Sequence, residues 1–141
     1  MDIIVDLKNA IRKSIYELDK TVNFNFEEIQ TATYPYVFFY ISNYRIIEHI
    51  DPTRNAKLDL QCVLEYASEE NPKNADLWSY EDNLRLATKN FEFLNTKLFA
   101  QNLTFKIVDG VLQMTFDLTL YVKETDKTEL MKELQMTIKG A

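Results

Sequence analysis

The residues of this chain that could carry out catalysis or hold a metal ion are few and widely separated. The sequence has one histidine, His49, a possible general base, and one cysteine, Cys62, a possible nucleophile or metal ligand. One residue of each type cannot form a zinc site of the usual ligand spacing. The carboxylate pairs Glu27-Glu28 and Glu69-Glu70 are adjacent in polar connecting segments, where solvated charge is expected rather than an opposed acid and base.

We therefore predict no catalytic residues, no metal site and no cofactor, and we do not expect an enzyme. His49 is expected at the end of a strand beside a loop, in a surface or edge role. Cys62 is expected on the apolar face of a strand, where a buried and inert thiol is the usual outcome. Glycine occurs only at positions 110 and 140, which excludes a glycine-rich nucleotide loop.

The strongest candidate for a binding surface is a run of alternating aromatic residues. Its members are Tyr36, Phe38, Tyr40 and Tyr44. They are expected on one face of a strand over 36–48, and a loop containing Arg54 follows. Two interpretations remain open: a helix covers this face as part of the core, or the face contacts another subunit. Stacking on RNA is a weaker alternative, because only Arg45 and Arg54 supply basic charge nearby.

The elements that would position these residues are arranged around a β-hairpin over 102–123. Asp109-Gly110 lies between two runs that alternate apolar and polar residues, which is typical of a hairpin closed by a type I′ turn. The turn needs a positive φ at both central residues, which glycine adopts freely. A two-residue loop fixes the register. The expected pairs include Val108 with Val111, Ile107 with Leu112, Phe105 with Met114 and Leu103 with Phe116.

Further strands and helices are predicted on either side of this hairpin. The second hairpin strand is longer than the first, so we expect it to pair with another strand on its other edge. A half-buried strand is expected from Leu58 to Tyr66, and a short strand near 23–29. A first helix, capped by Asp2, is predicted from apolar residues spaced three or four apart. These residues are Ile4, Leu7, Ile11, Ile15 and Leu18.

The same spacing predicts a long helix from Asn74 to Phe99. The residues that recur are Leu77, Tyr80, Leu84, Ala87, Phe91, Leu94 and Leu98, and Trp78, Leu86 and Phe93 widen this stripe. One or two helical turns near Leu130 to Leu134 are expected in a peripheral segment, 124–141. The sequence therefore predicts an α+β fold in one domain over 1–141. It has an antiparallel sheet of two strand pairs with two main helices packed on one face.

Composition limits the classes of protein to which the chain can belong. At 141 residues with 46% hydrophobic residues, it can bury a core without disulfide bonds. The net charge of −6 and the lack of a basic stripe argue against specific nucleic-acid binding. A single cysteine fits a reducing compartment, and no apolar stretch is long enough for a signal peptide or a membrane span. We expect a soluble protein made in a cytoplasm.

The arrangement resembles that of a family of phage and prophage tail terminator proteins, which come from tailed phages of Gram-positive hosts. The resemblance covers nearly the whole chain. The matching pieces are Ile11 and Leu18 in the first helix, Glu27-Glu28-Ile29-Gln30 before Pro35, Phe38-Phe39-Tyr40-Ile41, Ile107-Val108-Asp109-Gly110-Val111-Leu112, and Met131-Lys132-Glu133-Leu134. The chain departs from the family pattern at Tyr36-Val37, where a small residue is expected.

The resemblance implies a structural virion protein with no catalytic residues. Such a protein caps the completed tail tube as a homo-oligomeric ring, with a hexamer as one possibility, and offers a surface to the head connector. Its partners would be itself, the tail tube protein and head-tail connector proteins, at the neck end of the virion tail. The alternatives are another phage neck protein, such as a head-completion or connector protein, or a small-molecule-binding α+β domain.

Overall fold

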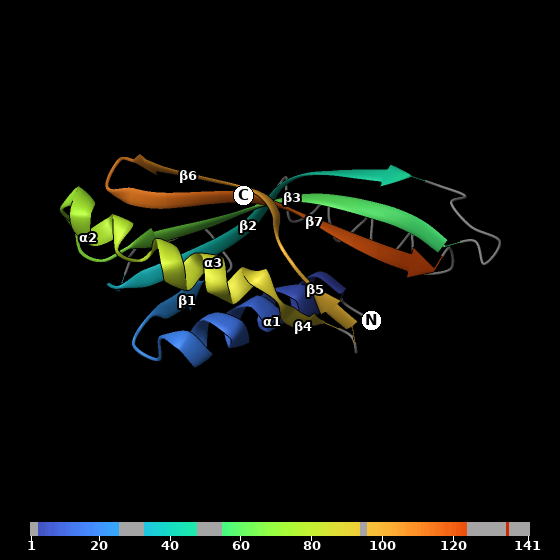
Figure 1. Cartoon of the computed structure of the whole chain (residues 1–141), viewed down its shortest axis with the longest axis horizontal. Helices are drawn as coiled ribbons and strands as arrows, with labels where there is room; N and C mark the ends of the chain where they lie inside the picture. The colour runs from blue at the N-terminus through green and yellow to red at the C-terminus, as the bar shows by residue number, and fades with distance from the viewer. Residues whose placement is uncertain (1–2, 26–32, 48–54, 94–95, 124–134, 136–141) are drawn as a thin grey trace.

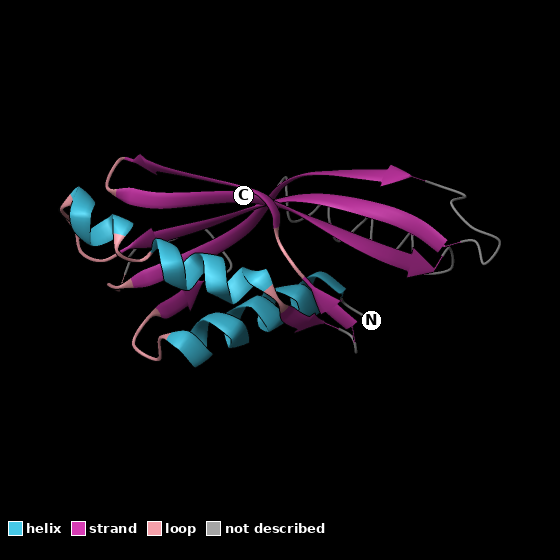
Figure 2. Cartoon of the chain, viewed as in Figure 1, coloured by secondary structure: helices cyan, strands magenta, loops and turns pink. Residues whose placement is uncertain are grey.

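A computed structural model of the chain describes residues 3–25, 33–47, 55–93, 96–123 and 135. Its helices and strands, in chain order, are α1 (Ile3–Leu18), β1 (Asn23–Asn25), β2 (Tyr36–Ile47), β3 (Asn55–Ala67), α2 (Asn74–Trp78), α3 (Glu81–Lys89), β4 (Phe91–Phe93), β5 (Thr96–Leu98), β6 (Gln101–Val108) and β7 (Val111–Lys123). Figures 1 and 2 show α1 and α3 side by side against one face of a twisted sheet. The helical turns expected near Leu130 to Leu134 lie outside the described residues, as does Asp2.

Five of the strands form one mixed sheet. Their order is β1-β2-β3-β7-β6, and β4 and β5 form a separate two-stranded sheet. β1 is parallel to β2, and every other neighbouring pair in the large sheet is antiparallel. The predicted α+β class is confirmed. The second hairpin strand pairs with a further strand on its other edge, as expected, because β7 pairs with β3 along most of its length. The prediction of a sheet of two antiparallel strand pairs is wrong in detail, because β1 adds a parallel strand at one edge.

The turn of the hairpin forms as its sequence predicts. Asp109 has φ +51° and Gly110 has φ +76°, so both central residues adopt the positive φ of a type I′ turn. Val108 pairs with Val111 and Ile107 with Leu112, as expected. A two-residue loop leaves no freedom for a shifted register, which is why a local signal was sufficient here.

The hairpin departs from the predicted register at its open end. Between Gln101 and Thr104 the pairing shifts, so that Gln101 rather than Asn102 lies opposite Asp117. Asn102 sits in the left-handed region at φ +55°, and its side-chain amide donates a hydrogen bond to Asp117 Oδ2 at 2.9 Å. This β-bulge explains why the expected pair of Leu103 with Phe116 is wrong.

α1 closes one side of the core with the predicted apolar face. Four of its residues are buried, and they are Ile4, Leu7, Ile11 and Ile15. They pack with alternate residues of the sheet, namely Val37, Phe39, Leu58, Leu60, Cys62, Leu64, Leu112, Met114, Phe116 and Leu118. Leu18, by contrast, is 46% exposed, because it ends the helix where Asp19 turns the chain by accepting hydrogen bonds from the backbone N–H and hydroxyl of Thr21.

The long helix predicted from Asn74 to Phe99 is wrong. The chain forms two short helices, α2 and α3, and then the β4–β5 strand pair. The break between the helices falls at Tyr80, whose ring stacks on Tyr66 with centroids 3.7 Å apart and planes 3° from parallel. The Tyr80 hydroxyl also donates to Asp19 Oδ2 at 3.0 Å, so tertiary contacts at the ring face and at the hydroxyl hold this turn in place.

Tertiary hydrogen bonds also end α3. The last carbonyl groups of a helix have no partner within the helix. Here the carbonyl of Ala87 accepts from the hydroxyl of Ser14 on α1, and that of Thr88 accepts from the backbone N–H of Ala100 at 2.8 Å. Asn90 has an extended backbone, and the strand β4 follows it. In β4 the side chains of Phe91 and Phe93 are buried and that of Glu92 between them is exposed. The predicted stripe also included Trp78 and Leu86, which are exposed.

Candidate interaction surface

The sheet has an outer face, the one turned away from α1 and α3. It is formed by Tyr36, Phe38, Tyr40 and Arg45 of β2, Lys57, Asp59, Gln61, Val63 and Glu65 of β3, and Gln113, Thr115, Asp117 and Thr119 of β7. Apolar and polar side chains alternate along these strands because successive residues point to opposite faces. Tyr36, Phe38 and Tyr40 of the predicted aromatic surface lie on this outer face.

Aromatic rings gather at one end of the outer face. We call Tyr34, Tyr36, Phe38 and Tyr40 the aromatic patch. The ring centroids of Phe38 and Tyr40 are 5.4 Å apart and those of Tyr34 and Tyr36 are 5.5 Å apart, both in tilted arrangements. Tyr34 is exposed, and the other three side chains are half-buried. Tilted ring pairs at this separation are favourable, so the patch is preorganised rather than loose.

Burial and a nearby carboxylate favour the neutral form of two patch tyrosines. Burial, the nearby charge of Glu65 and a hydrogen bond to Glu65 together raise the pKa of Tyr40 to about 12. Burial also raises the pKa of Tyr36, with further contributions from Tyr34 and Glu65. A neutral tyrosine donates its hydroxyl proton to the carboxylate and still offers an apolar ring, which is the combination common at protein interfaces.

The structure separates Tyr44 from the other predicted interface residues. Ile41 pairs with Cys62 and Asn43 with Gln61, so Ser42 is an extra residue in β2. This bulge reverses the alternation, and Tyr44 packs against the core with Ile46 instead of sharing the face of Tyr40. The expectation of one continuous face with Tyr44 is therefore wrong. Arg54 lies outside the described residues, and the assignment of these residues to a subunit interface remains a prediction.

Beyond the bulge the outer face is charged. Arg45 contacts Asp59 Oδ2 at 2.8 Å, and the Thr119 hydroxyl donates to Asp59 Oδ1 at 3.1 Å. These hydrogen bonds, the one from Arg45 above all, hold the pKa of Asp59 below its ordinary value. The outer face thus has an aromatic end and an ion-paired end.

Of the residues considered for catalysis or metal binding, the structure describes Cys62 and the pair Glu69-Glu70, which is exposed. Cys62 is fully buried on the inner face, and burial raises the pKa of its thiol, as expected for an inert cysteine. His49 and the pair Glu27-Glu28 lie outside the described residues. Within the described part of the chain, no three histidine, cysteine or acidic side chains are grouped so that they could hold a metal ion.

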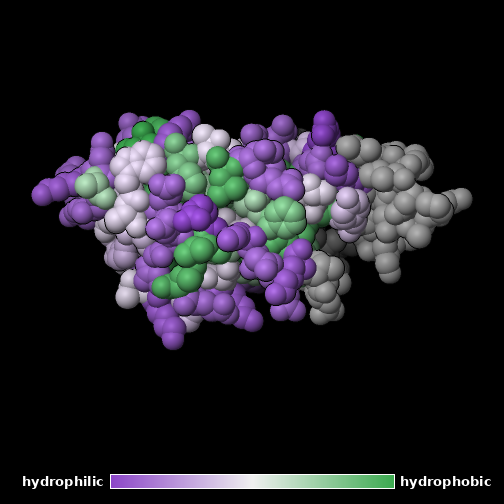
Figure 3. All heavy atoms as spheres, in the orientation of Figure 1, coloured by the Kyte–Doolittle hydropathy of each residue, from purple (hydrophilic) through white to green (hydrophobic). Residues whose placement is uncertain are grey.

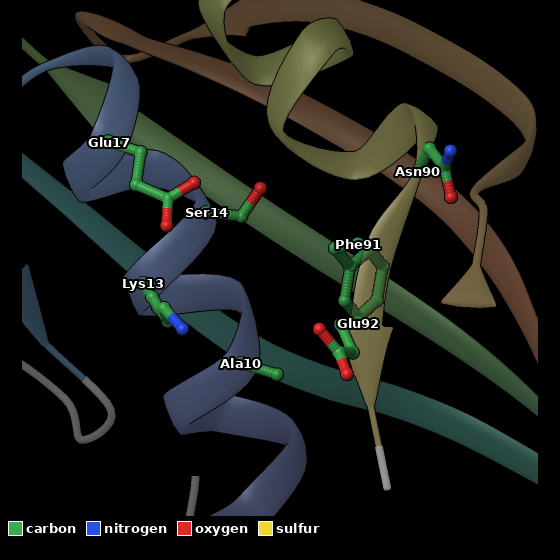
Figure 4. A pocket seen from close by; sticks show the side chains of 7 residues that line it. All are labelled: Ala10, Lys13, Ser14, Glu17, Asn90, Phe91 and Glu92. Atoms are coloured by element: carbon green, nitrogen blue, oxygen red, sulfur yellow. The ribbon is translucent and has the colours of Figure 1, made fainter. Parts of the chain in front are cut away.

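A shallow groove of about 370 Å³ lies between α1 and β4 (Figure 4). Its lining residues are Ala10, Lys13, Ser14 and Glu17 of α1, Asn90 just before β4, and Phe91 and Glu92 of β4. The charged side chains Lys13, Glu17 and Glu92 are exposed to solvent, and the Ser14 hydroxyl donates to the Ala87 carbonyl. The Ser14 hydroxyl therefore has a structural role. The charged side chains around it are solvated and of both signs, so they do not form the arrangement of a nucleophile with a general base.

Sequence comparison decides the family. A family model described as phage tail terminator protein matches residues 6–129. The chain belongs to the phage tail terminator family. The resemblance inferred from the sequence pattern is thereby confirmed, and the match includes both the aromatic patch and the hairpin turn at Asp109-Gly110. No curated protein matches the chain.

Membership of this family makes the chain a structural tail protein of a phage. It also implies contacts with other phage tail and head proteins. None of the described helices is long and apolar enough to cross a membrane. Figure 3 shows hydrophilic side chains with scattered hydrophobic ones over the described part of the visible surface.

Proposed function

We propose that this terminator protein caps the completed tail tube as a closed homo-oligomeric ring and offers a surface to the head connector, without catalysing a reaction. The family match over residues 6–129 carries this proposal. On this proposal the protein acts at the neck end of the virion tail, with the tail tube protein and the connector proteins as partners.

The aromatic patch is the proposed subunit contact. A ring requires a head-to-tail interface, in which one surface of each subunit meets a different surface of the next. Tyr36, Phe38 and Tyr40 supply apolar ring area, and Glu65 satisfies the Tyr40 hydroxyl. Removing water from such aromatic side chains costs little free energy, so they suit the centre of an interface rather than its solvated rim.

The charge of the chain supports a ring that lets DNA pass without holding it. The net charge is −6, and on the described surface Arg45 and Arg85 are each paired with a carboxylate. Carboxylates facing a central opening would repel phosphates and prevent adhesion. We therefore propose that the ring does not bind duplex DNA specifically.

The proposal is tested with a phage that lacks its terminator. Wild-type protein supplied in trans is expected to restore tails of normal length, and light scattering of concentrated protein is expected to show a ring-sized species. Normal tails without the protein, or no restoration when folded protein is present, would overturn the capping function.

The patch is tested with a matched pair of variants at one position. Tyr40→Glu places a charge within the patch and is expected to abolish ring formation and tail completion, because a buried, unpaired carboxylate at an interface costs several kcal/mol. Tyr40→Phe keeps the aromatic side chain and adds no charge, but it removes the hydroxyl that donates to Glu65, so it should assemble more weakly than the wild type and much better than Tyr40→Glu. Circular dichroism checks that both variants are folded. A folded Tyr40→Glu variant that completes tails normally would remove the aromatic patch from the interface.

A further inference from the structure

One edge of the large sheet is formed by β6, and β7 is its only neighbour among the described strands. Figure 1 shows β6 at one margin of the sheet, with α1 and α3 away from it. An edge strand presents a row of unpaired backbone groups that can template another strand, and natural proteins protect it with proline, bulges or several charged side chains. From Thr104 to Val108 there is no proline and no bulge, and Lys106 is the only charged residue.

The register with β7 identifies the backbone groups of β6 that face outward. In an antiparallel pair, residues alternate between those that exchange both hydrogen bonds with the partner and those that exchange none. The pair that flanks a two-residue loop, Val108 with Val111, is a bonded pair, and the alternation makes Lys106 the next bonded residue. The N–H and C=O groups of Phe105 and Ile107 therefore point away from β7, toward the open side.

Leu103 adds one more outward acceptor to this edge. Thr104 pairs with Thr115 and is the next bonded residue of the alternation, so its N–H points to β7. In a trans peptide the N–H and the preceding C=O point in opposite directions, so the carbonyl of Leu103 points outward. The edge therefore offers donors at 105 and 107 and acceptors at 103, 105 and 107.

The side chains along this edge form an apolar row and a polar row. On the inner face, Leu103, Phe105 and Ile107 pack against the core but remain half-buried. On the outer face, Thr104 and Lys106 are exposed. The other described strands that could serve as an edge, β1, β4 and β5, have three residues each, whereas β6 has eight. Within the described chain, the strand that matches this edge in length and side-chain pattern is β6 itself.

Most registers of two antiparallel β6 strands are unfavourable. With Lys106 on a two-fold axis, the two Lys106 side chains lie directly opposite each other, and like charges in that position are destabilising. With Ile107 on the axis, Phe105 faces Asp109, an acidic turn residue with φ +51°. With the axis before Phe105, the pairing runs into the bulge at Asn102, where φ is +55°. An axis at Phe105 avoids all three conflicts.

We propose that two copies of this chain pair through their β6 strands, antiparallel about a two-fold axis at Phe105, so that their sheets become one continuous sheet. The two Phe105 residues exchange backbone hydrogen bonds, and the N–H of each Ile107 donates to the carbonyl of Leu103 of the other copy. On the inner face Phe105 lies opposite Phe105, and Ile107 opposite Leu103. On the outer face Lys106 lies opposite Thr104. Both apolar rows are covered, and no like charges are directly opposed.

This joint does not rest on the ring of the proposed function. A two-fold contact uses the same surface on both copies, whereas a head-to-tail ring needs two different surfaces. β3 and β7 lie between β6 and β2, the strand that carries most of the aromatic patch, so the pairing leaves the patch accessible. The joint accordingly belongs to protein that is free of the tail, at concentrations below those at which rings assemble.

The first test changes the charge at Thr104, which is exposed and lies outside the aromatic patch. In this register, Thr104→Glu places an opposite charge facing Lys106 of the second copy, and Thr104→Lys places a like charge there. The two-fold axis repeats each pair, so the dissociation constant of the dimer should be roughly tenfold higher for Thr104→Lys than for Thr104→Glu. Sedimentation of the free protein measures it, and high salt should reduce the difference. Equal constants, or wild-type protein that stays monomeric, would overturn the joint.

The second test locates the axis with a matched pair of cysteine variants. Residues of a bonded antiparallel pair have Cα atoms about 5.5 Å apart, within the range that a disulfide bond spans. Phe105→Cys should therefore form a cross-linked dimer under mild oxidation. Lys106→Cys should not, because diagonal neighbours are about 7–8 Å apart, which is too far for a disulfide bond. Wild-type protein is the control, since Cys62 is buried. Cross-linking of Lys106→Cys in place of Phe105→Cys would show that the register is wrong.

The third test uses amide hydrogen exchange on unmodified protein, so it decides the matter even if a variant does not fold. In dilute, monomeric protein the amides of Phe105 and Ile107 should exchange fast, while that of Lys106 is protected by β7. In the dimer, the amides of Phe105 and Ile107 should slow by about tenfold or more. A dimer in which both amides still exchange fast uses another surface, and the inference is then wrong.

The outcomes separate this inference from the proposed function. If tails are completed by a protein that is monomeric when free of the tail, the β6 joint is wrong and the capping function stands. If the dimer forms with both amides protected but the protein completes no tails, the joint stands and the capping function fails. Protection that develops only when tail tube protein is added would assign the edge to that protein and refute pairing between copies.

Discussion

Phe116 is expected to contribute more to stability than almost any other residue of the sheet. It lies in β7, a central strand between β3 and β6, and its side chain is completely buried on the inner face. It pairs with Cys62 of β3 and packs in the cluster that α1 closes. Truncation to alanine leaves a cavity. The surrounding strands cannot move in to fill it, because their hydrogen bonds to one another hold them in place.

The expected cost of Phe116→Ala is about 3–5 kcal/mol in the free energy of unfolding. A domain of this size has a total stability of about 5–15 kcal/mol, so the variant would lose a large share of it. At about 3 °C per kcal/mol, the melting temperature should fall by roughly 9–15 °C.

Urea denaturation followed by circular dichroism measures this loss. The matched control is Tyr121→Ala on the same strand, because Tyr121 is 66% exposed and its removal should change stability by less than about 0.5 kcal/mol. The slope of unfolding free energy against urea should be equal in both variants and the wild type. A loss below about 1 kcal/mol for Phe116→Ala at unchanged slope would show that the inner face is not packed as described.

Two further expectations concern titratable side chains. Cys62 should react slowly with a thiol reagent in native protein and fast in urea, because burial excludes the reagent and raises the pKa of the thiol; equal rates would contradict its position on the inner face. The raised pKa values of Tyr36 and Tyr40 mean that the folded state favours the neutral form of both side chains. Their contribution to the free energy of unfolding is therefore complete below about pH 10 and is lost as the pH rises toward about 12. Unfolding free energies measured across this alkaline range should decline, and the decline should be shallower in Tyr40→Phe; an identical decline would argue against the Glu65 contact.

Local sequence determined the parts of this protein whose geometry is set by neighbouring residues. Asp109-Gly110 specified the turn, and the two-residue loop then fixed the first five pairs of the hairpin. The inward residues of α1 and of β3 followed from periods of 3.6 and 2, because burial on one face selects that spacing. The order of these pieces along the chain was also sufficient to indicate the tail terminator family.

Only the tertiary structure decided where regular elements stop or change face. Apolar spacing alone predicted one continuous helix from Asn74 to Phe99, where the structure has two helices and a strand pair. The choice came from Tyr80 stacking on Tyr66 and from partners for the carbonyls of Ala87 and Thr88, all distant in sequence. Likewise, the extra residue Ser42 moved Tyr44 to the inner face. A bulge depends on how two strands pair, and the sequence of one strand carries no information about the residues opposite it.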